Sequence, residues 1–408
     1  MATNQVGMKA ILQSADAPDH IALAGGIPDP DLFPIQQIQA VHQHLFSDDA
    51  VIKKALQYST ADGDSDLKTA LINSLLPASL SIEHKNILIT QGVQQGLDIL
   101  CRHYSGFQQS SVVCTEPTYP AFLNVTQLHQ QSIKTVDLDE QGLDIHQMTH
   151  HLEQGAAWVY LNPSYQNPTG CSLAAGNRQE IFQAASQHGV PIIEDTTYDA
   201  LFYSDKPYSP IAAYQDSMEQ GAVIQVGTVS KIMVPGYRIG WIVADEQTIT
   251  QLSNIKQSMD LCTSPIVQQV IAALLSDKEF FNAHLVRLRA VYHGKCQAMC
   301  QALQDYMPRQ CRWTIPQGGM FVWVTLPEQL SATRICQRLR DEEQVMCLPG
   351  QVFYQNRSDS HTLRLSFSLE SKANIRIGIE ALARVIDQEL STTVFPRSEN
   401  INSHQPYL

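Results

Sequence analysis

A lysine flanked by hydroxyl groups and an arginine is the clearest chemical feature of this sequence. Lys231 lies in VGTVSKIMVPGYRIGW, between Ser230 and a Pro-Gly turn, and Arg238 follows seven residues later. A lysine held among such groups suits an imine with a phosphorylated aldehyde. Arg238, Ser230 and Thr228 could then hold the phosphate. Taken alone, the segment also fits a salt-bridged loop.

A second segment, TQGVQQGLDIL, is typical of a strand, a glycine turn at Gly92 and a helix that begins near Val93. The free N–H groups and the positive dipole end of such a helix favour an anion. Glycine permits close approach of a ligand to the backbone. Strand-glycine-helix junctions also occur without ligands. This segment therefore supports an anion site only in combination with the segment around Lys231.

Three further residues follow predicted strands. Asp195, in VPIIEDTTYDAL, ends a buried strand, where a carboxylate is costly unless a cation such as a protonated pyridine nitrogen pairs with it. Tyr198 could direct its phenol at the same ring. Asn167, in LNPSYQNPTG, presents an amide donor from a proline-stiffened loop. Tyr119, in EPTYPAF, either stacks on a flat ring or is an ordinary turn aromatic.

These residues can lie close together only if the strands that they follow end at the same edge of one sheet. Short apolar runs alternate with amphipathic stretches such as 94–103 and 178–188, which predicts a mostly parallel sheet covered by helices on both faces. A long helix near 277–306 and strand-like segments at 320–325 and 363–368 come later. The seven strand candidates are 86–90, 112–116, 133–138, 158–162, 191–196, 223–228 and 239–244.

This order predicts an α/β protein with a large domain and a small α+β domain. We expect the large domain at 46–285, the small domain at 286–395 and a tail at 396–408. The N-terminal segment, 1–45, is expected to join the small domain. Within it, the Gly and Pro spacing of LAGGIPDPDLFP predicts a loop that crosses between the domains.

Composition narrows the class of protein. The chain has 408 residues and a formal charge of −13, which argues against nucleic acid as a main partner. Without a run of about 18 apolar residues or a signal pattern, we expect no membrane partner and a cytoplasmic location. The nine cysteines lack C-x-x-C pairs and the histidines lack an HExxH frame, so no metal site is expected.

The motifs occur in the order phosphate turn, tyrosine, asparagine loop, aspartate strand, lysine loop and, later, Arg364 in LRLSFS. In this order they resemble the fold-type I pyridoxal-phosphate enzymes, specifically the class I/II aminotransferases, over about residues 20–390. LAGGIPDPDLFP, LQYSTADGDSDL, PSYQNPTG, PQGGMFVWVTLP and LPGQVFY are most similar to the α-aminoadipate and kynurenine aminotransferase branch. The resemblance implies an aspartate-aminotransferase-like fold with a seven-stranded sheet, pyridoxal phosphate, and amino transfer between an L-amino acid and a 2-oxo acid.

The resemblance also implies roles for single residues. Lys231 resembles the lysine that forms the internal aldimine and shuttles the proton, and Asp195 resembles the partner of the pyridine nitrogen. Asn167 and Tyr198 match residues that bond the ring 3-oxygen, and Tyr119 matches the stacking aromatic. The residues that match the phosphate cup are Gly92, Val93, Gln94, Thr228, Ser230 and Arg238.

Further positions concern the substrate and a second subunit. Arg364 resembles the arginine that receives the substrate α-carboxylate, and Gly26 and Asn167 match substrate-binding positions. Tyr58, in LQYSTADG, matches a tyrosine that reaches the phosphate of a neighbouring subunit, which implies a homodimer with shared sites. Lys9 falls where a basic residue can meet a distal substrate carboxylate; an acidic substrate and a solvated helix lysine both fit it.

Three alternatives to transamination stay open at this point. The same motifs serve β-elimination, oxidation or carbon–carbon bond formation, because the substrate pose selects the bond that breaks. A ligand-sensing domain of a transcription regulator would need a preceding DNA-binding module, and about twenty residues precede LAGG. A catalytically dead binding protein is disfavoured by the presence of Lys231, Asp195 and Arg364.

Overall fold

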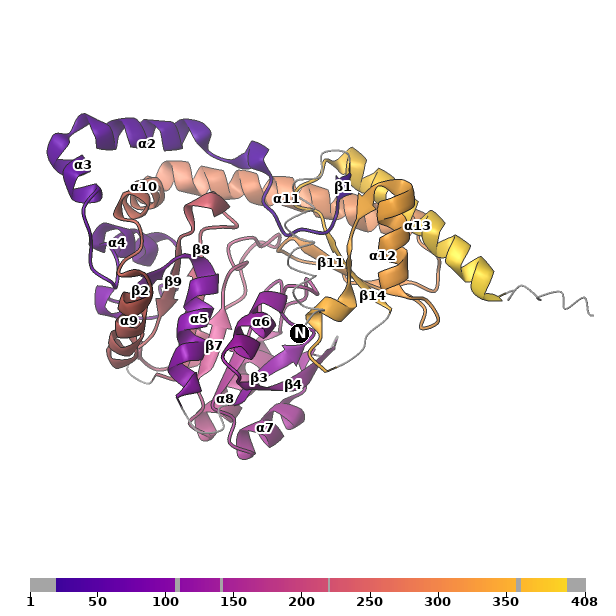
Figure 1. Ribbon diagram of the computed structural model, residues 1–408, viewed down its shortest axis with the longest axis horizontal. Coiled ribbons are helices and arrows are strands. Elements are labelled where there is room, and N and C mark those ends of the chain that lie inside the picture. Colours follow the sequence, from indigo (N-terminus) through magenta and orange to yellow (C-terminus); the bar gives the residue numbers. More distant parts are fainter. Residues whose placement is uncertain (1–19, 107–110, 140–141, 219–220, 357–360, 395–408) are drawn as a thin grey trace, which may run out of the picture.

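The computed structural model describes residues 20–106, 111–139, 142–218, 221–356 and 361–394 (Figure 1). Figure 1 shows a large lobe around one sheet and a smaller lobe beside it, with the long helix α11 (Lys278–Tyr306) running along both. The expected domain boundary at 285/286 falls inside this continuous helix, and the division into domains stays a prediction. Lys9 and the tail at 396–408 lie outside the described residues.

The large sheet confirms the predicted α/β class with a mostly parallel sheet. Its order is β2-β9-β8-β7-β6-β3-β4-β5, in which β8, β7, β6, β3 and β4 run parallel, while β9 runs antiparallel to β8 and β2, and β5 antiparallel to β4. All seven predicted strands form. They are β2 (Ile87–Thr90), β3 (Ser111–Glu116), β4 (Ser132–Asp139), β6 (Trp158–Leu161), β7 (Ile192–Asp195), β8 (Val223–Thr228) and β9 (Gly240–Val243).

An eighth strand makes the sheet larger than the seven strands expected. This strand, β5 (Gly142–Leu143), has two residues, and such a short element leaves no apolar pattern to detect. It begins at Gly142, whose φ of 123° is a conformation that glycine adopts without strain.

The strands are buried because helices cover both faces of the sheet. Successive strand residues point to opposite faces, so Ile192 joins one apolar cluster and Ile193 joins the other. The cluster around Ile193 includes side chains of α5 (Gly92–Ser105), α6 (Pro120–Leu128) and α9 (Glu246–Asp260). The cluster around Ile192 includes side chains of α4 (Ser65–Ser74), α7 (Ile145–Glu153), α8 (Ala175–Gln187) and α10 (Pro265–Ser276).

Aspartate side chains cap several helices, but α5 begins differently. Asp64, Asp144 and Asp245 accept hydrogen bonds from the first free N–H groups of α4, α7 and α9. Among the described residues, Gln91 gives α5 no such side-chain cap. The free N–H groups at the start of α5 therefore remain available at the edge of the sheet.

The small lobe is built on a four-stranded antiparallel sheet. Its order is β10 (Arg312–Trp313), β11 (Phe321–Thr325), β14 (Thr362–Ser366) and β13 (Leu348–Pro349), so β14 lies in the interior. Helices α11, α12 (Ala332–Glu343) and α13 (Lys372–Val394) pack beside it. The short 3₁₀ helices of the chain include η2 (His84–Asn86), η3 (Ile211–Tyr214), η5 (Pro235–Tyr237) and η6 (Gly350–Phe353).

The N-terminal segment touches both lobes. Strand β1 (Ile21–Ala22) pairs with β12 (Val345–Met346) of the small lobe. After the 3₁₀ turn η1 (Pro30–Leu32), α2 (Ile35–Ser47) packs on α10 and leads into α3 (Asp49–Ala55). The segment between β1 and η1 therefore crosses from the small lobe to the large one, as the loop LAGGIPDPDLFP was expected to do.

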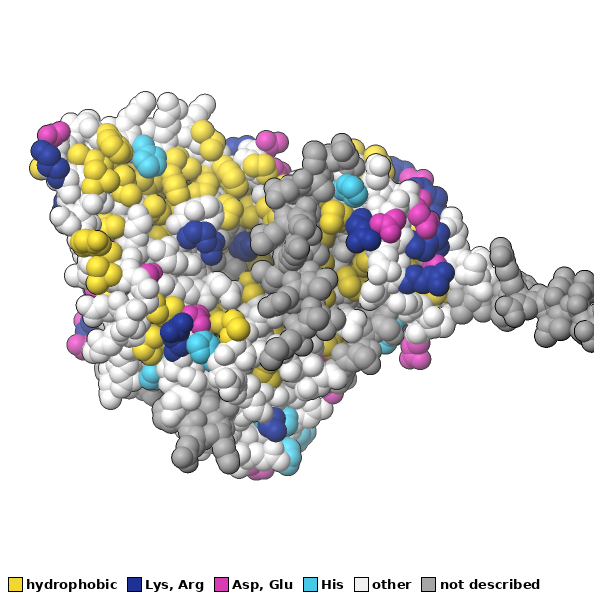
Figure 2. Space-filling view, viewed as in Figure 1, with side chains coloured by type: hydrophobic (Ala, Val, Ile, Leu, Met, Phe, Trp, Pro, Cys, Tyr) yellow, Lys and Arg dark blue, Asp and Glu magenta, His cyan; other side chains and the backbone are white. Residues whose placement is uncertain are grey.

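Apolar side chains lie exposed along this N-terminal part. Figure 2 shows hydrophobic groups gathered over the region of α2, α3 and α10. Ile35, Phe46, Leu56 and Tyr58 are each more than half exposed, at 60%, 58%, 64% and 78%. Such a concentration of large apolar groups on one face is typical of an interaction surface.

Candidate active site

Side chains from both lobes meet at the edge where the parallel strands of the large sheet end. Asp195 is the last residue of β7, and Lys231 follows β8 by three residues. Asn167 lies in the loop after β6, and Tyr119 precedes α6. Arg364 comes from β14 of the small lobe and donates from Nη1 to Asn167 Oδ1 at 2.7 Å. Sequence reasoning placed all five at one site, and the structure brings them together.

Lys231 has an amine that is easily neutralised. Its Nζ donates to the carbonyl of Gly26 at 2.8 Å. Burial lowers the pKa of Lys231 to about 8, with further lowering by the positive charges of Arg364 and Arg238 and an opposing effect of Asp195. The neutral amine, which can act as a base or nucleophile, is therefore populated at much lower pH than for an ordinary lysine.

Asp195 is a buried carboxylate held by uncharged donors. It is 4% exposed and accepts hydrogen bonds from Tyr160 Oη at 2.8 Å and from the N–H and Oγ1 of Thr197 at 3.0 and 2.6 Å. Asn162 Nδ2 donates to its backbone carbonyl at 2.7 Å. Burial raises the pKa of Asp195 although these donors act in the opposite direction. The position suits a carboxylate that meets a cation.

Sequence reasoning did not identify these supporting residues. Tyr160 and Asn162 belong to β6 and the residue after it, and β6 is the neighbour of β7 in the sheet. Their proximity to Asp195 depends on strand order, which no local pattern reveals. Thr197 is two residues from Asp195, so an aspartate followed by a nearby threonine was the one available signal.

Two tyrosines and Asn167 line the space beside Asp195. Burial and the nearby Asp195 charge raise the pKa of Tyr119 to about 12. Burial likewise raises the pKa of Tyr198, whose hydroxyl hydrogen-bonds with Asn167. The Tyr198 ring meets Phe321 edge to face, with centroids 5.6 Å apart. Both phenols therefore stay protonated at neutral pH and can donate hydrogen bonds.

Residues predicted to bind the phosphate lie near the start of α5. Gly92 has a φ of 72°, and a Cβ at this position would lie 2.5 Å from Arg238 Nη2. Arg238 Nη1 donates to Ser230 Oγ at 3.3 Å, and Thr228 Oγ1 donates to the same oxygen at 2.8 Å. An arginine and two hydroxyls thus face a helix N-terminus, an arrangement that favours a phosphate.

Val93 and Gln94 differ in their environments. Val93, which stands where the resembled family often has a hydroxyl residue, is 8% exposed and packs in the cluster of α5, α6 and α9. Its side chain serves the core, and its backbone N–H belongs to the first turn of α5. Gln94 is exposed on the same turn.

Arg364 is the most constrained cation of the site. It is 1% exposed, its Nη2 donates to the carbonyl of Ala24, and its guanidinium lies 4.3 Å from the ring centroid of Phe321 and 4.9 Å from that of Phe353. Burial lowers its pKa to about 10, so it stays charged at neutral pH. Its Nε is buried and lacks a hydrogen-bond partner among the described residues, so one donor of the guanidinium is unsatisfied there.

Gly26 lies at the site, whereas Tyr58 lies apart from it. A Cβ on Gly26 would be 2.5 Å from Phe321 Cζ, so a larger residue would push the loop away from Lys231. Tyr58 is exposed on the segment after α3, and the structure of one chain does not bring it to the other residues. Lys9 lies outside the described residues, so its predicted role stays a prediction.

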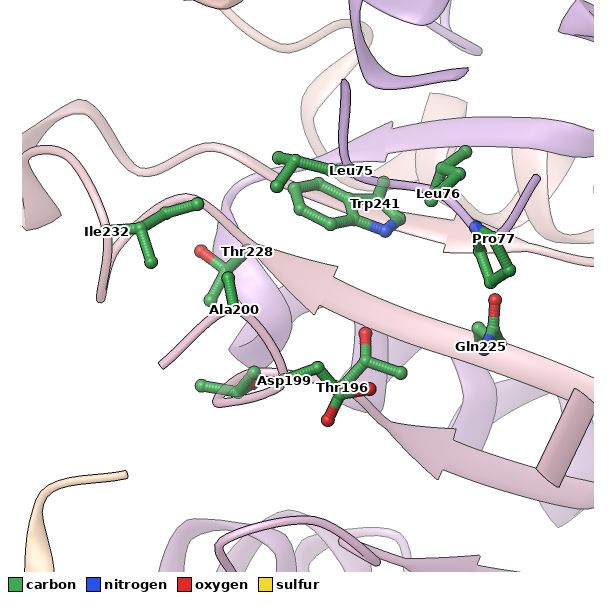
Figure 3. Close-up of a pocket in the computed structure, with 11 residues that line it drawn as sticks. Leu75, Leu76, Pro77, Thr196, Asp199, Ala200, Gln225, Thr228, Ile232 and Trp241 are labelled. Atoms are coloured by element: carbon green, nitrogen blue, oxygen red, sulfur yellow. The ribbon is translucent and has the colours of Figure 1, made fainter. Parts of the chain in front are cut away.

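A small cavity lies beside this site (Figure 3). It has a volume of about 60 Å³, and it is lined by residues that include Thr196, Gln225, Thr228 and Trp241. Binding pockets for small molecules are usually several hundred Å³, so this cavity is too small for an amino acid. The groups described above therefore define the candidate site.

The described part of the chain offers neither a metal-binding cluster nor a membrane-spanning helix. The described residues contain no cluster of three or more His, Cys, Asp or Glu side chains suited to a metal ion. None of the helices formed by these residues is both long and apolar enough to span a bilayer.

Comparisons with known proteins agree with this geometry. The family model for aminotransferase class I and II matches residues 21–382. The chain is 34% identical to an aromatic-amino-acid aminotransferase of Thermococcus litoralis, over 94% of this chain and 93% of the relative.

Two solved structures are also similar. One is a kynurenine aminotransferase of Pyrococcus horikoshii, with a TM-score of 0.87, 34% identity and 94% of each chain covered. The other is an α-aminoadipate aminotransferase of Thermus thermophilus, solved with N-(5′-phosphopyridoxyl)-L-leucine, with a TM-score of 0.87, 30% identity and coverage of 94% of this chain and 95% of that one. The chain belongs to the class I and II aminotransferase family and is a pyridoxal-phosphate-dependent transaminase.

Proposed function

We propose that this transaminase carries out amino transfer with the side chains that meet at the strand ends, with Lys231 as the proton-transfer base. The observation that carries the proposal is the convergence of a partly buried lysine, a buried aspartate and a buried arginine from three different parts of the chain. Burying three ionisable groups together is costly unless a ligand uses their charges.

The residues fit pyridoxal phosphate. Asp195 accepts its side-chain hydrogen bonds from uncharged donors among the described residues, so its negative charge suits the protonated ring nitrogen. Arg238, Ser230 and Thr228 with the N–H groups of α5 suit the phosphate. A side chain at position 92 would collide with Arg238 and fill this cradle.

The proposed steps use the protonation states of the chain's own groups. When bound, pyridoxal phosphate supplies the aldehyde that takes up the amino group and the ring that accepts electrons released at Cα. Asp195 holds the proton on the ring nitrogen. The Lys231 amine, whose pKa of about 8 makes the neutral form available, takes the proton from the substrate Cα.

Arg364 is proposed to bind the substrate α-carboxylate. Its planar guanidinium is fixed by Asn167, the Ala24 carbonyl and two aromatic rings, and its Nε is left to donate. A carboxylate fixed in this way sets which Cα bond faces the ring. The relatives are named for aromatic, kynurenine and α-aminoadipate substrates, so we propose an L-amino acid with an aromatic or acidic side chain.

We also propose a homodimer with shared sites. Among the described residues, Tyr58 makes no hydrogen bond to the site residues of its own chain, and it follows α2 and α3, which carry exposed apolar side chains, along the sequence. A second copy that covered this face would bury these groups and could bring the Tyr58 hydroxyl to the neighbouring phosphate. This arrangement gives a reason for a largely exposed tyrosine on an apolar surface.

Lys231→Ala should abolish amino transfer. We expect turnover to fall by at least about 10³-fold, because both the nucleophile and the base are lost. The long-wavelength absorbance of the lysine-bound cofactor should also disappear. In the wild type, an amino acid should convert this absorbance and a 2-oxo acid should restore it. Lys206→Ala, at an exposed lysine, is the control; retained turnover in Lys231→Ala would reject the role.

Arg364→Ala should weaken binding of the amino-acid substrate. Loss of one partner of a buried charge pair costs about 2–5 kcal/mol. Affinity can be measured by titrating the cofactor spectrum with the amino acid. Arg376→Ala, at a guanidinium that bonds the Tyr306 hydroxyl on the surface, should leave affinity unchanged. An unaltered affinity in Arg364→Ala would show that another group binds the carboxylate.

Gly92→Ala should lower the affinity for pyridoxal phosphate. The added Cβ would meet Arg238 and strain a backbone with positive φ, at a cost of about 1–2 kcal/mol from the strain alone. Gly189→Ala is a matched control, because Gly189 has a φ of 64° but open space around it. Equilibrium dialysis of both variants should show weaker binding for Gly92→Ala alone. Equal affinities would mean that the cup lies elsewhere.

Mixed dimers can test whether sites are shared. Lys231→Ala and Tyr58→Phe chains can be coexpressed to give mixed dimers. If Tyr58 of each chain contacts the site of the other chain, one site of the mixed dimer carries both substitutions and the other site is intact. The hydrogen bond to phosphate is worth about 1.5–3 kcal/mol, so the Tyr58→Phe homodimer should bind the cofactor weakly. The mixed dimer should recover one tight site per two chains. Absence of recovery would place Tyr58 within its own subunit's site or outside both.

A further inference from the structure

The segment between β1 and η1 holds two carbonyl groups at the active site. We call residues 23–29 the strap. The Gly26 carbonyl accepts from Lys231 Nζ at 2.8 Å, and the Ala24 carbonyl accepts from Arg364 Nη2. These are contacts to the two groups proposed as the base and the carboxylate-binding residue. The position of the strap therefore affects both.

The strap is fixed to the small lobe at its first end. The backbone N–H of Ser366, on β14 two residues after Arg364, donates to the Leu23 carbonyl at 2.8 Å. The Ala22 N–H just before the strap donates to Glu370 Oε1 at 2.8 Å. Between this end and Asp29 lie Gly25 and Gly26, which leave the backbone free to take many conformations. A second attachment is therefore needed to fix the Gly26 carbonyl.

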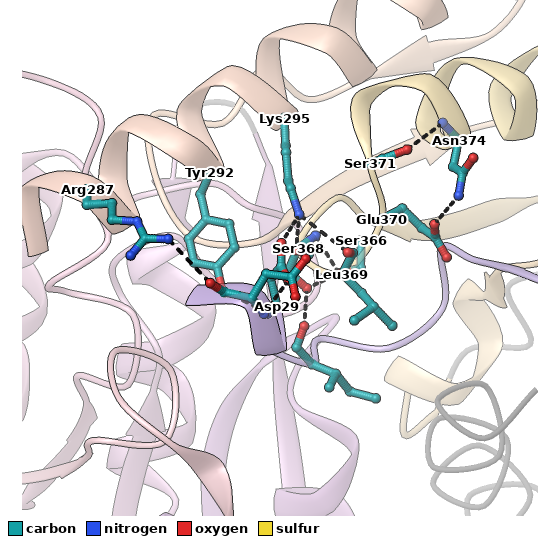
Figure 4. A network of polar contacts seen from close by, with 12 residues as sticks. Asp29, Arg287, Tyr292, Lys295, Ser366, Ser368, Leu369, Glu370, Ser371 and Asn374 are labelled. Atoms are coloured by element: carbon teal, nitrogen blue, oxygen red, sulfur yellow. Dashed lines mark hydrogen bonds and ion pairs between the residues drawn. The ribbon is translucent and has the colours of Figure 1, made fainter. Parts of the chain in front are cut away.

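Lys295 provides that second attachment. From α11, its Nζ donates to Asp29 Oδ2 at 2.6 Å, to the Ser368 carbonyl at 2.9 Å and to the Leu369 carbonyl at 3.3 Å. Figure 4 shows the ammonium pointing into this group of acceptors. Its three protons match three acceptors. One side chain thus joins the strap to the segment that follows β14.

Neighbouring bonds make the attachment rigid. The Ser368 hydroxyl donates to the Ile27 carbonyl at 2.7 Å, and the Asp29 N–H donates to the Tyr292 hydroxyl at 3.2 Å. Asp29 is flanked by Pro28 and Pro30, whose φ angles are fixed by their rings. Anchoring Asp29 therefore also restricts the residues beside it, three positions from Gly26.

The pair is buried, which bears on its role. The Lys295 and Asp29 side chains are 7% and 14% exposed. Desolvation offsets much of the attraction in a buried ion pair, and apolar replacements are often as stable. The acceptors of Lys295 lie on the strap, which contacts Lys231 and Arg364, or just beyond β14, the strand that carries Arg364. Fixing a position accounts for this placement better than added stability does.

We propose that Lys295 is a positioning residue that, through Asp29 and the Ser368 and Leu369 carbonyls, holds the strap so that the Ala24 and Gly26 carbonyls meet Arg364 and Lys231. The inference rests on the proposed roles of those two residues in binding and proton transfer. Loosening the strap should therefore weaken amino-acid binding, while the cofactor remains attached to Lys231.

Lys295→Met in the holoenzyme tests this proposal. We expect the KM for the amino acid to rise about tenfold, with kcat changed much less. A tenfold change is the effect of losing one hydrogen bond, here the bond from Arg364 to the Ala24 carbonyl that the strap holds in place. The absorbance of the lysine-bound cofactor should persist. Arg338→Met is the matched control, because Arg338 pairs with Glu389 in the small lobe away from the strap. An unchanged KM in folded Lys295→Met would overturn the proposal.

A double variant separates positioning from stability. Lys295→Met combined with Asp29→Asn removes both charges, so stability should recover toward the wild type while the raised KM persists. If KM returned to the wild-type value together with stability, Lys295 would have a structural role and the proposal would fail. Lys295→Arg, which keeps the charge, should restore part of the lost affinity.

Hydrogen exchange gives a readout that does not depend on catalysis. In Lys295→Met, the amides of Asp29 and Ser366 should exchange faster than in the wild type, while amides of the large sheet should not. Unchanged exchange at both amides would overturn the anchor. Faster exchange with normal Lys231→Ala turnover would instead reject the proposed role of Lys231 and leave the anchoring of the strap supported.

Discussion

Burial of charge is the constraint on which this site depends. Asp195, Lys231 and Arg364 are held where desolvation opposes their charged forms, so each pKa moves toward neutrality. The fold offsets this cost differently for each group: neutral donors surround Asp195, aromatic rings with Asn167 and the Ala24 carbonyl hold Arg364, and the Gly26 carbonyl accepts from Lys231. For Lys231, burial lowers the pKa to about 8, so the neutral amine that proton transfer needs is populated.

The charge of the site differs from that of the chain. A formal charge of −13 argues against phosphate backbones as partners, yet the site gathers Lys231, Arg238 and Arg364 around one carboxylate. The cofactor and the amino-acid carboxylate are both anionic, so a locally positive pocket in an acidic protein draws them in while the outer surface repels other anions. The net charge of the chain therefore indicates which ligands the outer surface repels. The charge of the site has to be derived from its own residues.

The sequence predicted the site residues that follow strands better than the residues that reach the site from a neighbouring strand. Asp195, Asn167, Tyr119 and Lys231 follow apolar runs, and parallel strands bring such positions to one edge, so their meeting could be expected. Tyr160 reaches Asp195 because β6 neighbours β7, and this order is not written in either segment. Strand β5 was missed because two residues have no periodicity. Lys295 and Asp29 are 266 positions apart, and a lone helix lysine gave no sign of its partner.

Splitting the site between two lobes explains why the strap matters. The large lobe supplies Lys231 and Asp195, the small lobe supplies Arg364, and neither sheet fixes the distance between them. The strap contacts Lys231 and Arg364 through the backbone of two residues that are two positions apart, so a single short segment sets their relative position. Backbone carbonyls suit this task because they have no rotamers to lose. Gly26 suits it because any side chain would collide with Phe321 and push the carbonyl away. The flexibility that Gly26 gives the backbone then has to be restricted elsewhere in the strap. The buried ion pair between Lys295 of α11 and Asp29, which lies between two prolines, restricts it without placing a bulky group at the site.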